Sequence, residues 1–167
     1  MTAIDAGLAL LRVCLGLTMA AHGYGKLFRG GRIPGTARWF DGMGMRPGTV
    51  HAWLAAGTEA GAGILFALGL LTPLAAAAFV ALMVVAAWTV HREHGFFVAE
   101  NGWEYNLVLA VGAVAIAVTG AGRISLDWVI FDGNPVTGWT ALAVSAGLGL
   151  VSGVALLAAC YRPARTA

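Results

Sequence analysis

The chain has 167 residues, enough for one domain, and 59% of them are hydrophobic whereas only 11% are charged. Soluble domains carry about a quarter charged residues, so this sequence has too little polar surface to cover itself in water. The mean hydropathy is +0.81. The composition therefore excludes a soluble globular protein and predicts an all-α transmembrane helical bundle, with residues 1–167 forming a single membrane domain.

Apolar runs of about twenty residues, the length that crosses a ~30 Å hydrocarbon core, predict five transmembrane helices. They lie at about residues 8–28, 51–71, 73–90, 104–121 and 136–161. Between the first two, about residues 36–45 predict an interfacial amphipathic helix with Trp39 and Phe40 facing lipid. Two glycine pairs at four-residue spacing can allow close helix contacts, Gly57 with Gly61 and Gly149 with Gly153.

The basic residues predict an orientation. One side of the membrane receives Lys26, Arg29, Arg32, Arg38, Arg46, Arg92, Arg162 and Arg165, and the other only Arg12 and Arg123. The positive-inside rule places the larger group in the cytoplasm, with the N-terminus out and the C-terminus in. The bias toward Ala, Gly, Val and Arg is typical of GC-rich bacteria, so we expect a multi-pass protein of the bacterial plasma (inner) membrane. We expect no nucleic-acid partner, because the basic residues form no patch with interleaved aromatics.

Ionisable residues inside a membrane span are costly and usually find partners in the bundle interior. His22 and Lys26 lie one helical turn apart in the first helix. Measured from the cytoplasmic ends of their helices, His22 lies about 9 Å deep and Glu59 about 12 Å deep. The matching depths predict one polar network of His22, Lys26 and Glu59. Three further residues of the predicted cluster open or approach the fourth helix at the same face: His94, Glu104 and Tyr105.

This cluster has two interpretations. A buried glutamate beside a lysine and a histidine can simply hold helices together. It can also form a substrate, quinone or proton site, in which Glu59 is the strongest candidate because it lies deepest in a membrane span. No catalytic residue can be assigned, and the spacing of the histidines gives no reason to expect a metal or haem. On the opposite side, we expect Arg12 and Asp127 to form a structural ion pair.

Several motifs resemble one family. The run Leu10-Leu11-Arg12-Val13 through His22-Gly23-Tyr24-Gly25-Lys26-Leu27 resembles the first helix of the DoxX family. The Glu59 helix ending in Leu68-Gly69-Leu70-Leu71-Thr72-Pro73, the His94-Gly95-Phe96-Phe97 loop with Glu104-Tyr105, and Gly120 to Asp127 match the later pattern in order. The resemblance covers about residues 8–131. It implies a four-helix membrane core, to which the fifth helix is an addition.

The same resemblance implies thiosulfate:quinone oxidoreduction or, as in mycobacteria, a membrane-associated oxidoreductase complex with superoxide dismutase and a sulfurtransferase. We favour the interpretation that this protein is the membrane anchor of such a redox complex. The anchor itself would have no intrinsic cofactor and would dock acidic soluble subunits on its basic cytoplasmic loops. Because no flavin, haem or dithiol motif occurs, we expect a partner-dependent subunit, with quinone as the candidate ligand. Two alternatives stay open: a non-catalytic accessory or assembly subunit, and a small transporter or lipid-binding protein.

Overall fold

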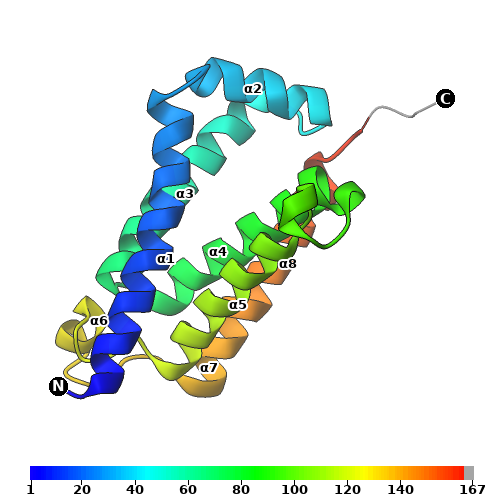
Figure 1. Ribbon diagram of the computed structural model, residues 1–167. Coiled ribbons are helices and arrows are strands. Elements are labelled where there is room, and N and C mark those ends of the chain that lie inside the picture. The colour runs from blue at the N-terminus through cyan, green and yellow to red at the C-terminus, as the bar shows by residue number, and fades with distance from the viewer. Residues whose placement is uncertain (164–167) are drawn as a thin grey trace.

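The computed structural model describes residues 1–163 and is helical apart from its connecting loops (Figure 1). The long helices are α1 (Ala3–Phe28), α3 (Gly48–Leu68), α4 (Thr72–Ala86), α5 (Glu104–Thr119) and α8 (Gly149–Cys160). The shorter elements are α2 (Arg32–Met43), η1 (Ala87–His91), η2 (Arg92–His94), η3 (Val98–Glu100), α6 (Leu126–Ile130), α7 (Gly138–Leu142) and η4 (Ala143–Leu148). Residues 1–163 contain no β-strand, which confirms the predicted all-α bundle; Arg165, counted above with the basic tail, lies outside these residues.

Three of the described helices are long and apolar enough to cross a membrane: Ala3–Phe28, Thr72–His94 and Gly138–Cys160. The second joins α4 to the turns η1 and η2, and the third joins α7, η4 and α8. The helix α5 is apolar but shorter, and α3 has 21 residues yet carries His51 and Glu59. The number of spans, five from the sequence, stays a prediction.

The helices form two groups, and the site lies between them. In the first, α1 packs along α3, and α2 covers the end where α1 stops and α3 begins. In the second, α4 packs against both α5 and α8. The groups meet near the tight turn between α3 and α4, diverge toward the end that carries α2, and are joined there by the loop after α2 (Figure 1).

Small residues allow α1 and α3 to pack closely. A Cβ atom added to Gly16 would lie 2.6 Å from the carbonyl oxygen of Gly63, so a larger side chain at Gly16 would push the two backbones apart. The predicted contact at Gly57 and Gly61 is wrong, because both face outward and no described neighbour lies within 4 Å of an added Cβ. The sequence identified the right helix but the wrong face.

The C-terminal helix α8 is part of the bundle. Gly149 and Gly153 lie directly against α4, so this predicted pair does mark a helix contact. Beyond the helix, Tyr161 pairs with Met45 in an isolated antiparallel bridge, and the amide of Arg162 donates to the Gly44 carbonyl at 2.7 Å. These bonds connect the end of α8 to the loop between α2 and α3.

Arg12 and Asp127 are both buried near the α3–α4 turn, but they are not bonded to each other as predicted. The guanidinium of Arg12 donates to the Ala67 carbonyl at 2.8 Å, in the last turn of α3, and to the loop before α6. The carboxylate of Asp127 accepts from the amides of Leu71 at 2.7 Å and Thr72 at 2.9 Å. The described residues contain no direct ion pair between the two. Instead, Arg12 caps the carbonyl end of α3 and Asp127 caps the amide end of α4, so each charge faces a helix end of opposite partial charge.

The short helix α2 differs from the sequence-based expectation in one side chain. Trp39 is half exposed, but Phe40 is only 7% exposed and packs with its ring centroid 6.2 Å from that of His51. The prediction that both rings face lipid is therefore wrong for Phe40. Asp41 accepts a hydrogen bond from the amide of Gly48 at 2.7 Å, which caps the start of α3.

Candidate functional site

The structure brings Lys26 and Glu59 together in an ion pair. Lys26 lies in the last turn of α1, and its ammonium group donates to both carboxylate oxygens of Glu59, at 2.7 and 2.6 Å. The side chains are 21% and 11% exposed, so the pair is mostly shielded. An ammonium group has three donors, and Glu59 accepts from two of them, which leaves one N–H of Lys26 for another acceptor.

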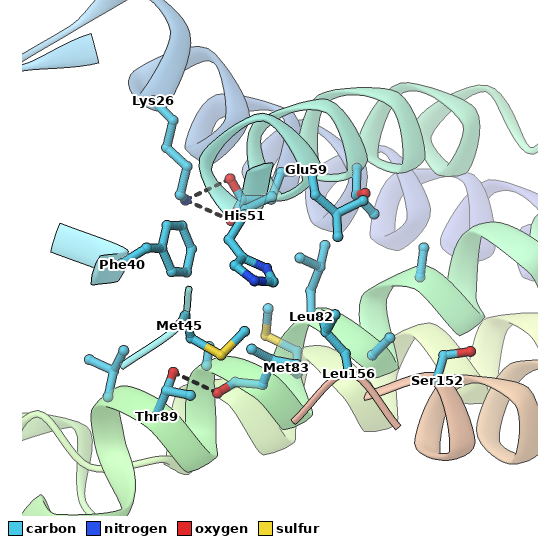
Figure 2. Close-up of a pocket in the computed structure, with 18 of the residues that line it drawn as sticks. Lys26, Phe40, Met45, His51, Glu59, Leu82, Met83, Thr89, Ser152 and Leu156 are labelled. Carbon is cyan, nitrogen blue, oxygen red and sulfur yellow. Dashed lines mark hydrogen bonds and ion pairs between the residues drawn. The ribbon is translucent and has the colours of Figure 1, made fainter. Parts of the chain in front are cut away.

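This ion pair borders a cavity of about 360 Å³ between α2, α3, α4 and α8 (Figure 2). Most of the wall is apolar and comes from four elements, with Phe40, Met45, Leu82, Met83 and Leu156 among the lining residues. Thr58, Thr89 and Ser152 also line it, and the hydroxyl of Thr89 donates to the Val85 carbonyl at 2.8 Å. The cavity is thus an apolar space with a few polar groups.

His51 is a buried polar residue of this cavity. It lies in the first turn of α3, is 4% exposed, and points into the cavity between Phe40 and Met83 (Figure 2). Within residues 1–163, its Nε2 atom has no hydrogen-bond partner. A buried polar atom without a partner costs about 1–3 kcal/mol, so a ligand that bonded Nε2 would recover this energy.

Four of the predicted cluster residues lie elsewhere. His22 and Tyr105 are exposed side chains of α1 and α5 whose ring centroids are 6.4 Å apart, and neither lines the cavity. Nδ1 of His94 lies 3.1 Å from the Val90 carbonyl, and Glu104 accepts from a loop amide at 2.9 Å. His94 and Glu104 therefore shape the loop between α4 and α5, and only Lys26 and Glu59 of the six border the cavity.

The sequence-based prediction missed the contributions of His51 and α8. His51, Ala55, Thr58 and Glu59 follow the spacing i, i+4, i+7 and i+8, so they form one stripe of α3, and all four line the cavity. That stripe is a signal that could have found His51. The α8 wall, Ser152 and Leu156, had no such signal, because it depends on how α8 docks against α4.

A second, outward-facing groove of about 630 Å³ runs between α4, α5 and α8. The residues that line it include no charged side chain. Its buried polar residue, Asn106, donates to the sulfur of Met83 at 3.6 Å, and its Oδ1 atom has no partner among the described residues. This groove therefore resembles a lipid-facing surface more closely than the first cavity does.

The apolar helices and the shielded ion pair beside a mostly apolar cavity define a small helical membrane protein with an internal amphipathic site. The DoxX family model matches residues 7–92, slightly more than half of the chain, and the protein belongs to the DoxX family. The matched part contains Lys26, His51 and Glu59 but ends before α5 and α8. The α8 wall of the cavity thus lies outside it.

Two relatives can be compared with the chain. A protein of Haemophilus influenzae, named only "Uncharacterized protein", is 30% identical over 93 residues, which cover 56% of this chain and 62% of that protein, less than two thirds of its length. A protein of Bacillus subtilis named "Putative oxidoreductase CatD" is 28% identical over 130 residues, which cover 78% of this chain and 91% of that protein. No solved structure matches the chain.

Proposed function

We propose that this protein is the membrane anchor of an oxidoreductase assembly and that its cavity receives the head group of a quinone. The observation that carries the proposal is the unpartnered, buried Nε2 of His51, which points into an apolar cavity beside the Lys26–Glu59 ion pair. Binding pockets for small molecules commonly combine apolar walls with a few well-placed polar groups.

The charge balance of the site favours a neutral ligand. Lys26 and Glu59 neutralise each other across 2.6 Å, so an anionic phosphate or carboxylate head group would gain little from Lys26 and would approach Glu59 unfavourably. A quinone ring is neutral and has two carbonyl acceptors. The remaining N–H of Lys26 and the Nε2–H tautomer of His51 are donors for those carbonyls, and the apolar walls suit the ring faces.

A quinone carries two electrons and two protons between membrane enzymes. The sequence has no motif for a flavin, haem or redox dithiol, so in this proposal a partner subunit supplies the electrons. The name of the Bacillus subtilis relative, "Putative oxidoreductase CatD", supports a redox setting. The residues of this chain bind and orient the ring.

The partner would dock on the end of the bundle that carries α2. Exposed arginines gather there after α1, along α2, before α3 and in η2: Arg29, Arg32, Arg38, Arg46 and Arg92. Such a surface attracts an acidic protein. By the positive-inside rule this end faces the cytoplasm of a bacterium, with the N-terminus on the other side of the plasma membrane.

Co-purification tests both parts of the proposal. The protein is isolated from crosslinked native membranes, the captured subunits are identified, and bound quinone is extracted and quantified. We expect an oxidoreductase subunit and bound quinone with the wild type, and loss of the quinone in His51→Leu, which removes the free donor and keeps the ion pair. His22→Leu is the matched control, because His22 lies outside the cavity.

Other outcomes would contradict the proposal. Recovery of phospholipid without quinone would favour a lipid-binding or transport protein. Capture of membrane proteins without any oxidoreductase would favour an accessory subunit of another complex. Turnover by the purified protein alone would show a self-sufficient enzyme instead of an anchor.

A further inference from the structure

The cavity opens at the outer surface of the bundle between two helices. Both α3 and α8 pack on α4, but within the described chain they do not pack along each other. Two residues that line the cavity from these helices are also exposed, Leu54 of α3 at 48% and Ser152 of α8. Toward the α2 end, the Met45–Tyr161 bridge connects the two sides. The opening therefore lies between α3 and α8, on the side of this bridge that faces the α3–α4 turn.

The cavity is also elongated along α4. Six side chains that line it from α4 and the adjoining η1 recur at helical spacing, so they form one stripe: Ala78, Ala81, Leu82, Val85, Ala86 and Thr89. Met83 and Val90 of the same elements also line the cavity. From Ala78 to Thr89 this stripe extends about 16 Å at the rise of an α-helix. Its members near the middle of the helix, Ala78 and Ala81, are small. The lining of the cavity thus continues along α4 with small apolar side chains, and we call this stretch at Ala78 and Ala81 the channel.

We propose that a quinone with a polyprenyl tail enters this cavity sideways from the bilayer, between α3 and α8, and that its tail lies along Ala78 and Ala81 and leaves past Ser152. The inference rests on the proposed quinone site and adds the route and the substrate class to it. The neutral polar end at Lys26, Glu59 and His51 takes the ring, and the adjoining apolar channel takes a chain that stays dissolved in lipid. The site therefore selects membrane-soluble quinones over water-soluble ones.

The test compares quinones with and without a tail. Purified wild-type protein in lipid nanodiscs is titrated with ubiquinone and menaquinone and with the tail-free rings of the same two compounds. The same titrations use Ala81→Leu and Ser152→Leu, which narrow the channel and its opening. Ala155→Leu is the matched control, because Ala155 is an exposed residue of α8 that does not line the cavity. Unchanged thermal stability and monodispersity show that each variant is folded.

We expect the two channel variants to bind the tailed quinone at least about tenfold more weakly. Binding of the tail-free ring should change less than about twofold, and Ala155→Leu should bind both as the wild type does. Equal weakening of both ligands, or no weakening of either, would overturn the lateral route and leave the quinone site in place. Failure of the wild type to bind either ligand would overturn the proposed function itself.

Discussion

The ammonium group of Lys26 lies 2.6 and 2.7 Å from the two carboxylate oxygens of Glu59, 33 residues further along the chain. The pair joins the last turn of α1 to the middle of α3 and borders the cavity. Its two charges are mostly shielded, and each depends on the other for compensation. This dependence makes the pair the most sensitive point of the site.

Removal of one partner of the ion pair should therefore lower the free energy of unfolding more than removal of both. We expect Glu59→Leu to lower the free energy of unfolding by about 3–5 kcal/mol, because it leaves the Lys26 charge without a partner. The double variant Glu59→Leu with Lys26→Met should recover part of that loss. The measurement is equilibrium unfolding in mixed detergent micelles.

The exposed pair of Arg92 and Glu93 is the control for this cycle. Its closest N–O distance is 3.6 Å, and its side chains are 41% and 79% exposed. Glu93→Leu should change the free energy of unfolding by less than about 0.5 kcal/mol. A loss at Glu59 no larger than the loss at Glu93 would show that the buried pair is energetically unimportant.

The contact between α1 and α3 predicts different effects for two glycines. Gly16→Ala should destabilise the protein by about 1–3 kcal/mol, because the added Cβ would lie 2.6 Å from backbone atoms of α3. Gly57→Ala, on the outward face of α3, should be neutral or stabilising by up to about 1 kcal/mol. Thermal unfolding in detergent measures both, and the reverse order would contradict the described packing of α1 on α3.

The cap at the α3–α4 turn predicts a graded series. Asp127→Ala leaves two amides without an acceptor and should cost about 1–3 kcal/mol. Asp127→Asn should cost less, because its amide oxygen can still accept one of the two bonds. Glu100→Ala, at an exposed residue of η3, is the control. Equal stability of all three variants in chemical unfolding would refute the capping role.

The proposed orientation can be tested with single cysteines. In a variant with Cys14→Ala and Cys160→Ala, Arg38→Cys lies on the α2 end and Asn134→Cys near the opposite end, and both positions are exposed. On intact cells, a membrane-impermeant maleimide should label residue 134 and not residue 38. The reverse pattern would place the basic end outside the cell.

Much of the fold could be predicted from the sequence, because hydropathy and helix length determine where apolar helices lie. The predicted segment 73–90 lies within Thr72–His94, and 104–121 overlaps Glu104–Thr119 closely. The matching depths of His22 and Glu59, with Lys26 one helical turn from His22, led to one predicted network, of which the structure forms the Lys26–Glu59 pair. Depth gives no rotation about the helix axis, however, and for that reason His22 was placed in a cluster that it does not join.

The remaining features depend on tertiary contacts. Arg12 and Asp127 bind backbone groups at the α3–α4 turn. From the sequence, two opposite charges on the same side of the membrane predict an ion pair, and nothing in it indicates that each caps a different helix end. His51 became a candidate only once α2, α4 and α8 were seen to enclose it. The position of α8 depends on Gly149 and Gly153 against α4 and on the bridge at Tyr161, which hydropathy does not encode.

The central claim is that the cavity beside Lys26, His51 and Glu59 is a quinone site, and photolabelling tests it most directly. A photoreactive quinone is crosslinked to the protein in membranes, and the labelled peptides are mapped with and without excess natural quinone. We predict competed labelling of α3 residues 51–59 and of α4 around Met83 and Thr89. Label that natural quinone does not displace, or label confined to the groove around Trp103 and Leu150, would contradict the claim.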